Sequence, residues 1–212
     1  MPPCAQEEDK ISIDSEGYII VAGDGACPEG QSDYRINRAG AGLFYGTNHS
    51  HNSDWEIQGP TQNAQRAEVE AAWRWASWAW DKQVCLTDSQ QVHDTLEKII
   101  GGEKIKVKKH RDLWRKIERS IRTKGEENFK VRKIKAHQTK KEKEGETSRE
   151  QKLRHMNEGA DLLAVKGAAR HKVDRKTVEV RKEYIKMAQD VQKYLKNIVP
   201  PALMLCIELG RY

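Results

Sequence analysis

The stretch YIIVAGDGAC, residues 18–27, decides the fold of this chain. Its first half, Tyr18 to Ala22, is rich in β-branched residues and predicts a buried strand that ends near Gly23. Asp24 follows at once, on the same strand face as Ile20 and Ala22. The small residues around this carboxylate leave room for a ligand. Asp24 is therefore a candidate functional residue, although a single aspartate at a strand end most often only caps a turn.

The sequence after this strand predicts further strands and helices in a mixed order. Strands are expected at 41–46 and 55–59, and because they are joined to the first strand by loops, the three should form an antiparallel meander. A tryptophan-rich helix follows, in which Val69, Trp73, Ala76 and Trp80 form the expected inward stripe. This helix is expected over residues 62–81. After it, helices are expected at 89–100 and 112–123, and strands at 84–87 and 129–136.

The C-terminal third predicts a loop and two more helices. Residues 138–154 are rich in Lys, Glu and Gln without periodicity, which is typical of a mobile loop. Asn157 is the expected N-cap of a helix that runs to about residue 169. The whole order indicates an α/β fold, a mixed five-stranded sheet flanked by helices, with a C-terminal helical extension.

Three segments are expected along the chain. Residues 1–16 form a flexible lead-in, 17–169 the folded domain and 170–212 the helical extension. In the extension, apolar residues repeat at alternating spacings of four and three from Val173 to Ile198. This stripe must be buried, either against its own domain or against a partner helix, so the oligomeric state stays open between a monomer and a self-associated form.

Charge is distributed unevenly along the 212 residues. Residues 1–97 carry 6 Lys/Arg against 16 Asp/Glu, whereas residues 98–143 carry 18 against 6. An acidic segment followed by a basic one suits a protein that collects cations at one place and a polyanion beside it. Helix faces that are merely solvated by Lys and Arg would give the same composition.

Other sequence features narrow the class of protein. No apolar run approaches the roughly 20 residues of a membrane-spanning helix, and we expect no membrane partner. The N-terminus has no pattern typical of a signal peptide, and the four scattered cysteines match neither a zinc spacing nor a disulfide framework. We expect an intracellular protein, nuclear or cytoplasmic, in a reducing compartment.

Four carboxylates stand where predicted elements begin or end. Asp24 and Asp88 follow strands, Glu68 lies one turn inside the first helix, and Asp161 lies in the first turns of the helix after the loop. Because open sheets place functional residues at the carboxyl ends of their strands, four such positions indicate a common site.

These residues belong to five short motifs, DGAC at 24–27, QRAE at 65–68, TDS at 87–89, KAH at 135–137 and NEGAD at 157–161. In this order they resemble the type 1 ribonuclease H family, over roughly residues 17–169. The long loop and the tail resemble the ribonuclease H domains of retroelement reading frames more than compact housekeeping enzymes. Whether the chain is a free enzyme or part of a polyprotein stays open.

The resemblance implies a reaction and a set of site residues. The reaction is hydrolysis of the RNA strand of an RNA/DNA hybrid with two Mg²⁺ ions, for which Mn²⁺ can substitute. Asp24, Glu68, Asp88 and Asp161 map to the metal ligands, and His137 to a histidine that shuttles a proton or aids product release. The residues expected to bind nucleic acid are Cys27, Gln65, Arg66, Lys104, Lys106, Lys108, Lys109 and Arg111.

The sequence also departs from the family. Only a short segment separates the helices at 89–100 and 112–123, so the family's basic helical protrusion is expected to be absent, with the nearby lysines replacing its charge. Ala64 stands where the family often has Asn. Two alternatives remain, a non-catalytic nucleic-acid-binding relative and a nuclease or integrase of different specificity on the same fold.

Overall fold

A computed structural model describes residues 11–28, 35–78, 82–135 and 147–198. Its centre is a five-stranded sheet in the order β3-β2-β1-β4-β5. The pairs β1–β2 and β2–β3 are antiparallel, and β1–β4 and β4–β5 are parallel, which confirms the mixed sheet. The strands are β1 Ile19–Ala26, β2 Gly40–Phe44, β3 Ser53–Glu56, β4 Gln83–Thr87 and β5 Phe129–Lys133.

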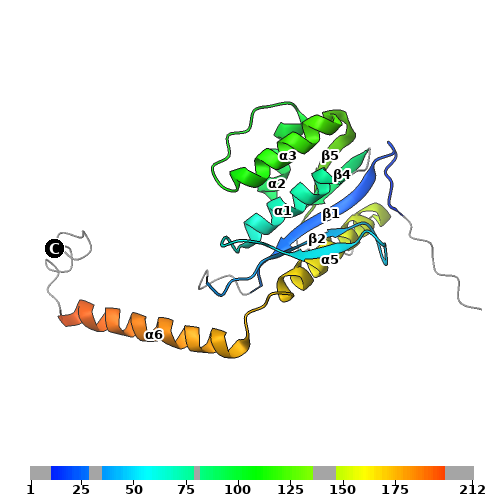
Figure 1. The fold of residues 1–212 in the computed structure, drawn as a ribbon. Coiled ribbons are helices and arrows are strands. Elements are labelled where there is room, and N and C mark those ends of the chain that lie inside the picture. The colour runs from blue at the N-terminus through cyan, green and yellow to red at the C-terminus, as the bar shows by residue number, and fades with distance from the viewer. Residues whose placement is uncertain (1–10, 29–34, 79–81, 136–146, 199–212) are drawn as a thin grey trace, which may run out of the picture. The chain divides into compact units, whose positions relative to one another are not determined.

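Helices cover both faces of this sheet, as Figure 1 shows. On one face α1 packs on β1 and α3 packs on α1, while α2 lies along β5. On the other face α5 crosses β1, β2 and β3. The helices are α1 Ala64–Ser77, α2 Gln90–Ile100, α3 Arg111–Lys124, α5 Ser148–Ala169 and α6 Arg175–Ile198, with a short 3₁₀ turn at Glu126–Asn128.

The buried tryptophan of α1 is not the one that the sequence pattern predicted. Trp75 is fully buried and meets Phe129 edge to face with ring centroids 5.3 Å apart. Trp73 is only half-buried and stacks under Lys116, whose Nζ lies 4.3 Å from the ring centroid. Val69 and Ala76 of the predicted stripe are fully buried, which confirms that part of the prediction. It is wrong for the tryptophan because α1 is apolar on two sides, between the sheet and α3, so that one stripe at helical spacing does not identify the most buried ring. Trp80 lies outside the described residues.

The structure also corrects the predicted loop at 138–154. Helix α5 begins at Ser148, so Asn157 lies inside the helix and is not its N-cap. The cap is Thr147, whose side chain accepts from the Glu150 backbone N–H while the Glu150 carboxylate accepts from the Thr147 N–H. This capping box is visible in the sequence as Thr-Ser-Arg-Glu, a signal that the charge-rich composition obscured.

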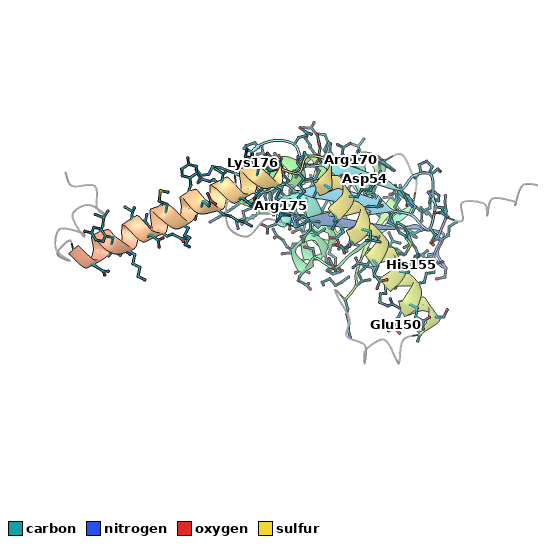
Figure 2. The ribbon with its side chains drawn as sticks, turned by 90° about the horizontal axis from the view of Figure 1, so that it is seen from below. Asp54, Glu150, His155, Arg170, Arg175 and Lys176 are labelled. Carbon is teal, nitrogen blue, oxygen red and sulfur yellow. The ribbon has the colours of Figure 1, made fainter. Side chains whose placement is uncertain are left out.

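One buried carboxylate ties the end of α5 to the edge of the sheet. Asp54 on β3 has a side chain only 6% exposed, and it receives Arg170 Nε at 2.7 Å and Lys166 Nζ at 3.2 Å. Figure 2 shows Asp54 beside Arg170 at this end of the helix. Because α5 carries both Asn157 and Asp161, this anchor helps to fix the angle at which α5 presents them to the sheet.

The predicted lead-in ends earlier than expected. Ile13 pairs with Ile19, and the Ile20 backbone N–H donates to the Ser12 carbonyl at 2.7 Å, so these residues are joined to the start of β1. Residues 1–10 lie outside the described residues.

The chain divides into two compact units, residues 1–172 and residues 173–212. The described part of the second unit is dominated by α6, a single helix of 24 residues that carries the predicted apolar stripe over most of its length. Among the described residues, the three hydrophobic clusters of the first unit consist of side chains up to Leu163.

We therefore expect a chain truncated after Lys172 to fold on its own. This end point keeps the hydrogen bond from His171 Nε2 to the Ala39 carbonyl, at 2.9 Å. Circular dichroism melting and light scattering of the full and truncated chains test this expectation. A truncated chain that fails to melt cooperatively would contradict it. A dimeric full chain with a monomeric truncated one would assign the stripe to self-association, and a lowered melting temperature without a change of mass would assign it to the chain's own domain.

Candidate active site

Two carboxylates meet at the carboxyl ends of the central strands. In the parallel pair β1–β4, Ala22 lies opposite Leu86, so that Asp24 and Asp88 come two residues later on the same face. This is the face on which Ile20, Ala22, Val84 and Leu86 pack against α5. Both carboxylates are half-buried, because the hydrophobic layer ends where they begin.

A third carboxylate, Glu68, comes from the opposite layer through a close approach of α1 to β1. A Cβ at Gly25 would lie 2.1 Å from the Glu68 backbone nitrogen, so only glycine permits the helix to lie this close. Asn63 starts α1 by accepting from the Arg66 N–H at 2.8 Å. The Ser89 hydroxyl donates to Glu68 Oε2 at 2.6 Å and orients this carboxylate.

Helix α5 supplies Asp161 and a partner for Asp88. One turn before Asp161, Asn157 donates from Nδ2 to Asp88 Oδ2 at 3.3 Å. The Asn157 side chain belongs to a residue only 9% exposed, so its position is set by packing. The four predicted ligands, Asp24, Glu68, Asp88 and Asp161, thus come from β1, α1, the end of β4 and α5.

The electrostatics indicate that these carboxylates share one region. Burial, followed by the charges of Asp88, Asp161 and Glu68, raises the pKa of Asp24 from 3.8 to about 8, although its bond from the Gly25 N–H acts in the opposite direction. Burial and the charge of Asp88 also raise the pKa of Glu68, against the bond from Ser89. Negative charge therefore accumulates here beyond what the surrounding side chains compensate.

The donor set fits hard divalent cations. All four groups are carboxylates, which Mg²⁺ and Mn²⁺ accept as oxygen ligands. A cation would relieve the repulsion that, after burial, adds to the raised pKa of Asp24. Among the described residues, no three His, Cys, Asp or Glu side chains are grouped tightly enough to hold one ion between them. A site that divides four carboxylates between two ions, with water and phosphate as the remaining ligands, does not require such a group.

Lys133 is a residue of this region that the sequence analysis did not single out. It ends β5, and its Nζ donates to the Asp88 carbonyl at 2.6 Å and to the Ile134 carbonyl at 3.3 Å. The ammonium group thus joins the ends of β4 and β5 beside the carboxylates. A lysine at the end of a basic strand has no sequence signal that separates it from the other basic residues of that strand.

The predicted nucleic-acid contacts at the start of α1 have protein partners. Arg66 forms a two-fold ion pair with Asp112 of α3, at 2.8 and 3.2 Å, which lowers the pKa of Asp112. Gln65 donates to Gln91 of α2. Cys27 is half-buried, and its Sγ lies 3.9 Å from the Gln62 carbonyl. Arg66 in particular joins α1 to α3, so that its guanidinium is already engaged in holding the two helices.

The predicted lysines lie on an extended segment between α2 and α3. No helix forms between Gly101 and His110, which confirms that the helical protrusion is absent. Ile105 and Val107 pack against the main core, while Lys104, Lys106, Lys108 and Lys109 are exposed. We call residues 104–109 the lysine strap. Apolar and basic residues alternate along the strap, so the apolar side chains fix its backbone on the core while the lysines extend into solvent.

With the activity that the resemblance implies, changing the four strap lysines to Gln is expected to weaken binding of the RNA/DNA hybrid and to leave its cleavage at saturating substrate nearly unchanged. Each lysine–phosphate interaction that the change removes should reduce the slope of log Kd against log salt by about 0.9. Fluorescence anisotropy over a salt series measures the slope, and Lys98→Gln on α2 is the single-site control. An unchanged slope would show that the strap lysines are only solvated.

His137, the predicted proton-shuttling residue, lies outside the described residues. Its role stays a prediction from the resemblance.

Comparisons with known proteins agree with this architecture. Residues 16–169 match the family model described as RNase H. No curated protein matches the chain. In the part of the chain that the structure describes, no helix is long and apolar enough to cross a bilayer.

Solved structures of viral proteins have the same fold. The solution structure of the PFV RNase H domain is similar with a TM-score of 0.51 and 22% identity, over 71% of this chain and 93% of that one. The protease-reverse transcriptase of Prototype Foamy Virus is similar with a TM-score of 0.51 and 22% identity, over 73% of this chain and 21% of that one. A foamy viral protease-reverse transcriptase in complex with RNA/DNA hybrid has a TM-score of 0.52 at 17% identity, over 79% of this chain and 22% of that one. With its family match, its mixed sheet and its carboxylates at the strand ends, the chain belongs to the RNase H family.

Proposed function

We propose that this protein is an endoribonuclease that hydrolyses the RNA strand of RNA/DNA hybrids with two divalent metal ions. One observation carries the proposal. Four half-buried carboxylates from both layers converge at the carboxyl ends of β1 and β4, where burial and then the charges of the other three raise the pKa of Asp24 to about 8. Repulsion among these carboxylates lowers the stability of the folded protein, and bound cations would remove this penalty.

The ligands would divide between the two ions around a shared centre. Asp24 and Asp88, from neighbouring strands, would form that centre, while Glu68 and Asp161 would bind from either side. When bound, two Mg²⁺ ions lower the pKa of a water and stabilise the charge that develops on the phosphate. In this reaction the water oxygen would form the new bond to phosphorus as the P–O bond to the departing sugar oxygen breaks. The water's proton would pass to a base, and the departing oxygen would take up a proton from solvent.

The surrounding side chains hold the ligands in place. Ser89 orients Glu68, Asn157 orients Asp88, and Lys133 fixes the backbone of Asp88. These three are positioning residues, because each acts through a carboxylate or its backbone. His137 would move a proton or aid product release, as the resemblance implies.

A cleavage assay with three labelled substrates tests the proposal. RNA/DNA hybrid, RNA duplex and DNA duplex are incubated with the full chain, with and without Mg²⁺. We expect cleavage of the RNA strand of the hybrid alone, and only with the metal ion. Binding of hybrid without cleavage would support the non-catalytic alternative, and cleavage of another duplex at an equal rate would overturn the hybrid specificity.

A further inference from the structure

A row of arginines lies along the exposed face of α3. Arg111, Arg115 and Arg119 are spaced four residues apart, which places them one above the other on a single face of the helix. All three are exposed. We call these three residues the arginine ridge. Only Arg111 belongs to the contacts that the sequence motifs suggested.

The ridge is not compensated by the acidic residues of its own helix. Asp112 is paired with Arg66 of α1, and Glu118 is paired with Arg122 at 2.7 Å. Within the described ranges, none of the three ridge arginines forms an ion pair or a side-chain hydrogen bond. A helix that neutralises both its acids and leaves three aligned guanidinium groups in solvent presents a concentrated positive surface.

The core fixes the ridge relative to the active site. The opposite face of α3 buries Leu113, Trp114, Ile117 and Ile121, each at most 2% exposed. The ion pair between Arg66 and Asp112 joins the start of the ridge to α1, two residues from Glu68. In Figure 1, α3 lies along the outer side of α1. The guanidinium groups therefore project from a rigid element that begins at the active-site end.

From this arrangement we propose that the arginine ridge binds the phosphate backbone of the hybrid beyond the segment that is cleaved. The ridge continues the lysine strap, since Lys109 and Arg111 are separated by one residue. From Arg111 to Arg119 it rises about 12 Å along the helix axis, a length equal to three to four base-pair steps at about 3.4 Å each. Arginine suits this role because its planar guanidinium binds phosphate through two parallel hydrogen bonds.

The inference rests on the proposed function for the identity of the duplex, but its test does not depend on cleavage. Fluorescein-labelled RNA/DNA hybrids are bound to the full chain in EDTA, and anisotropy is measured over a salt series. One hybrid is a short duplex, and two others are extended by about four base pairs at one end or the other, the length that the ridge spans. Cleavage of the same hybrids in Mg²⁺ is measured separately.

The triple variant Arg111→Gln, Arg115→Gln, Arg119→Gln is expected to reduce the salt slope by about 2.7 on one of the extended hybrids, and on the short one by no more than the roughly 0.9 that Arg111, next to the lysine strap, contributes there. Between 50 and 200 mM salt, this corresponds to about fortyfold less change in Kd. The charge-conserving change of all three to Lys should restore most of the slope. The single variant Arg115→Gln is measured as well, with Lys116→Gln as its matched control. Lys116→Gln removes the same charge from the same helix, but on the side that stacks on Trp73.

Each outcome decides one proposal. Equal salt slopes for the triple variant and the wild type on both extended hybrids would refute phosphate binding by the arginine ridge. A reduction of the slope by Lys116→Gln as large as that by Arg115→Gln would also refute it. Absence of cleavage in the wild type with the slope difference retained would overturn the proposed nuclease function and leave the ridge standing. An equal reduction of slope on the short hybrid would place the contacts within the cleaved segment and refute the proposed extension.

Discussion

Asp88→Asn should reduce cleavage of the hybrid by about a thousandfold or more, the largest effect expected of any single change in this chain. The substitution keeps the shape of the side chain but removes the negative charge of a ligand at the centre of the proposed site. Charge stabilisation by a bound metal contributes several kcal/mol to such a transition state, and each 1.4 kcal/mol corresponds to about a tenfold change in rate. Single-turnover cleavage in Mg²⁺ measures the loss.

Folding should survive this change. An asparagine at position 88 can still accept from Asn157, and its neutral amide removes one of the charges that repel Asp24. The melting temperature without metal should therefore stay equal or rise. Asp94→Asn, which changes an exposed carboxylate on α2, should leave activity unchanged. Wild-type cleavage that continues in excess EDTA would refute the two-metal mechanism, and a loss of less than tenfold in Glu68→Gln or Asp24→Asn would refute the ligand assignment.

Without metal, the protein should lose stability as pH rises from about 4 to 8. The pKa of Asp24 is 3.8 in its ordinary state and about 8 in the folded protein. Between these values the folded state holds a proton that the unfolded state releases, so rising pH favours unfolding. Above about pH 8 both states are ionised and the penalty is constant, at a few kcal/mol of unfolding free energy.

Comparison with Asp24→Asn isolates this contribution, because carboxylates with lowered pKa values such as Asp112 act in the opposite direction. The difference in unfolding free energy between the variant and the wild type, from urea titrations in EDTA, should grow across this window and then level off. Mg²⁺ at pH 8 should stabilise the wild type and have little effect on the variant. A difference that is independent of pH would show that Asp24 ionises normally in the folded protein.

Much of the fold could be predicted because it depends on local signals. The run from Tyr18 to Ala22 is rich in β-branched residues, short and ended by Gly23, which favours a buried strand. The order of strands and helices then limits the sheet to a few topologies. Predictions failed where two signals competed. The charge-rich composition before Asn157 concealed the capping box at Thr147, and two apolar sides of α1 concealed the burial of Trp75.

By itself, the sequence determined the mixed sheet, the residues at its strand ends and the absence of a helical protrusion. These features depend on strand propensity, on the order of motifs and on segment length, all of which are local properties of the sequence. Only the tertiary structure decided which side chains support the carboxylates and which basic residues face solvent. Lys133, Asn157 and Asp88 are far apart in the sequence and meet only because β4, β5 and α5 converge. The sequence does not distinguish Arg66 from Arg115. Packing of α1 against α3 pairs Arg66 with Asp112 and leaves Arg115 exposed to solvent. Such pairings depend on distances between elements, and local propensity carries no information about them.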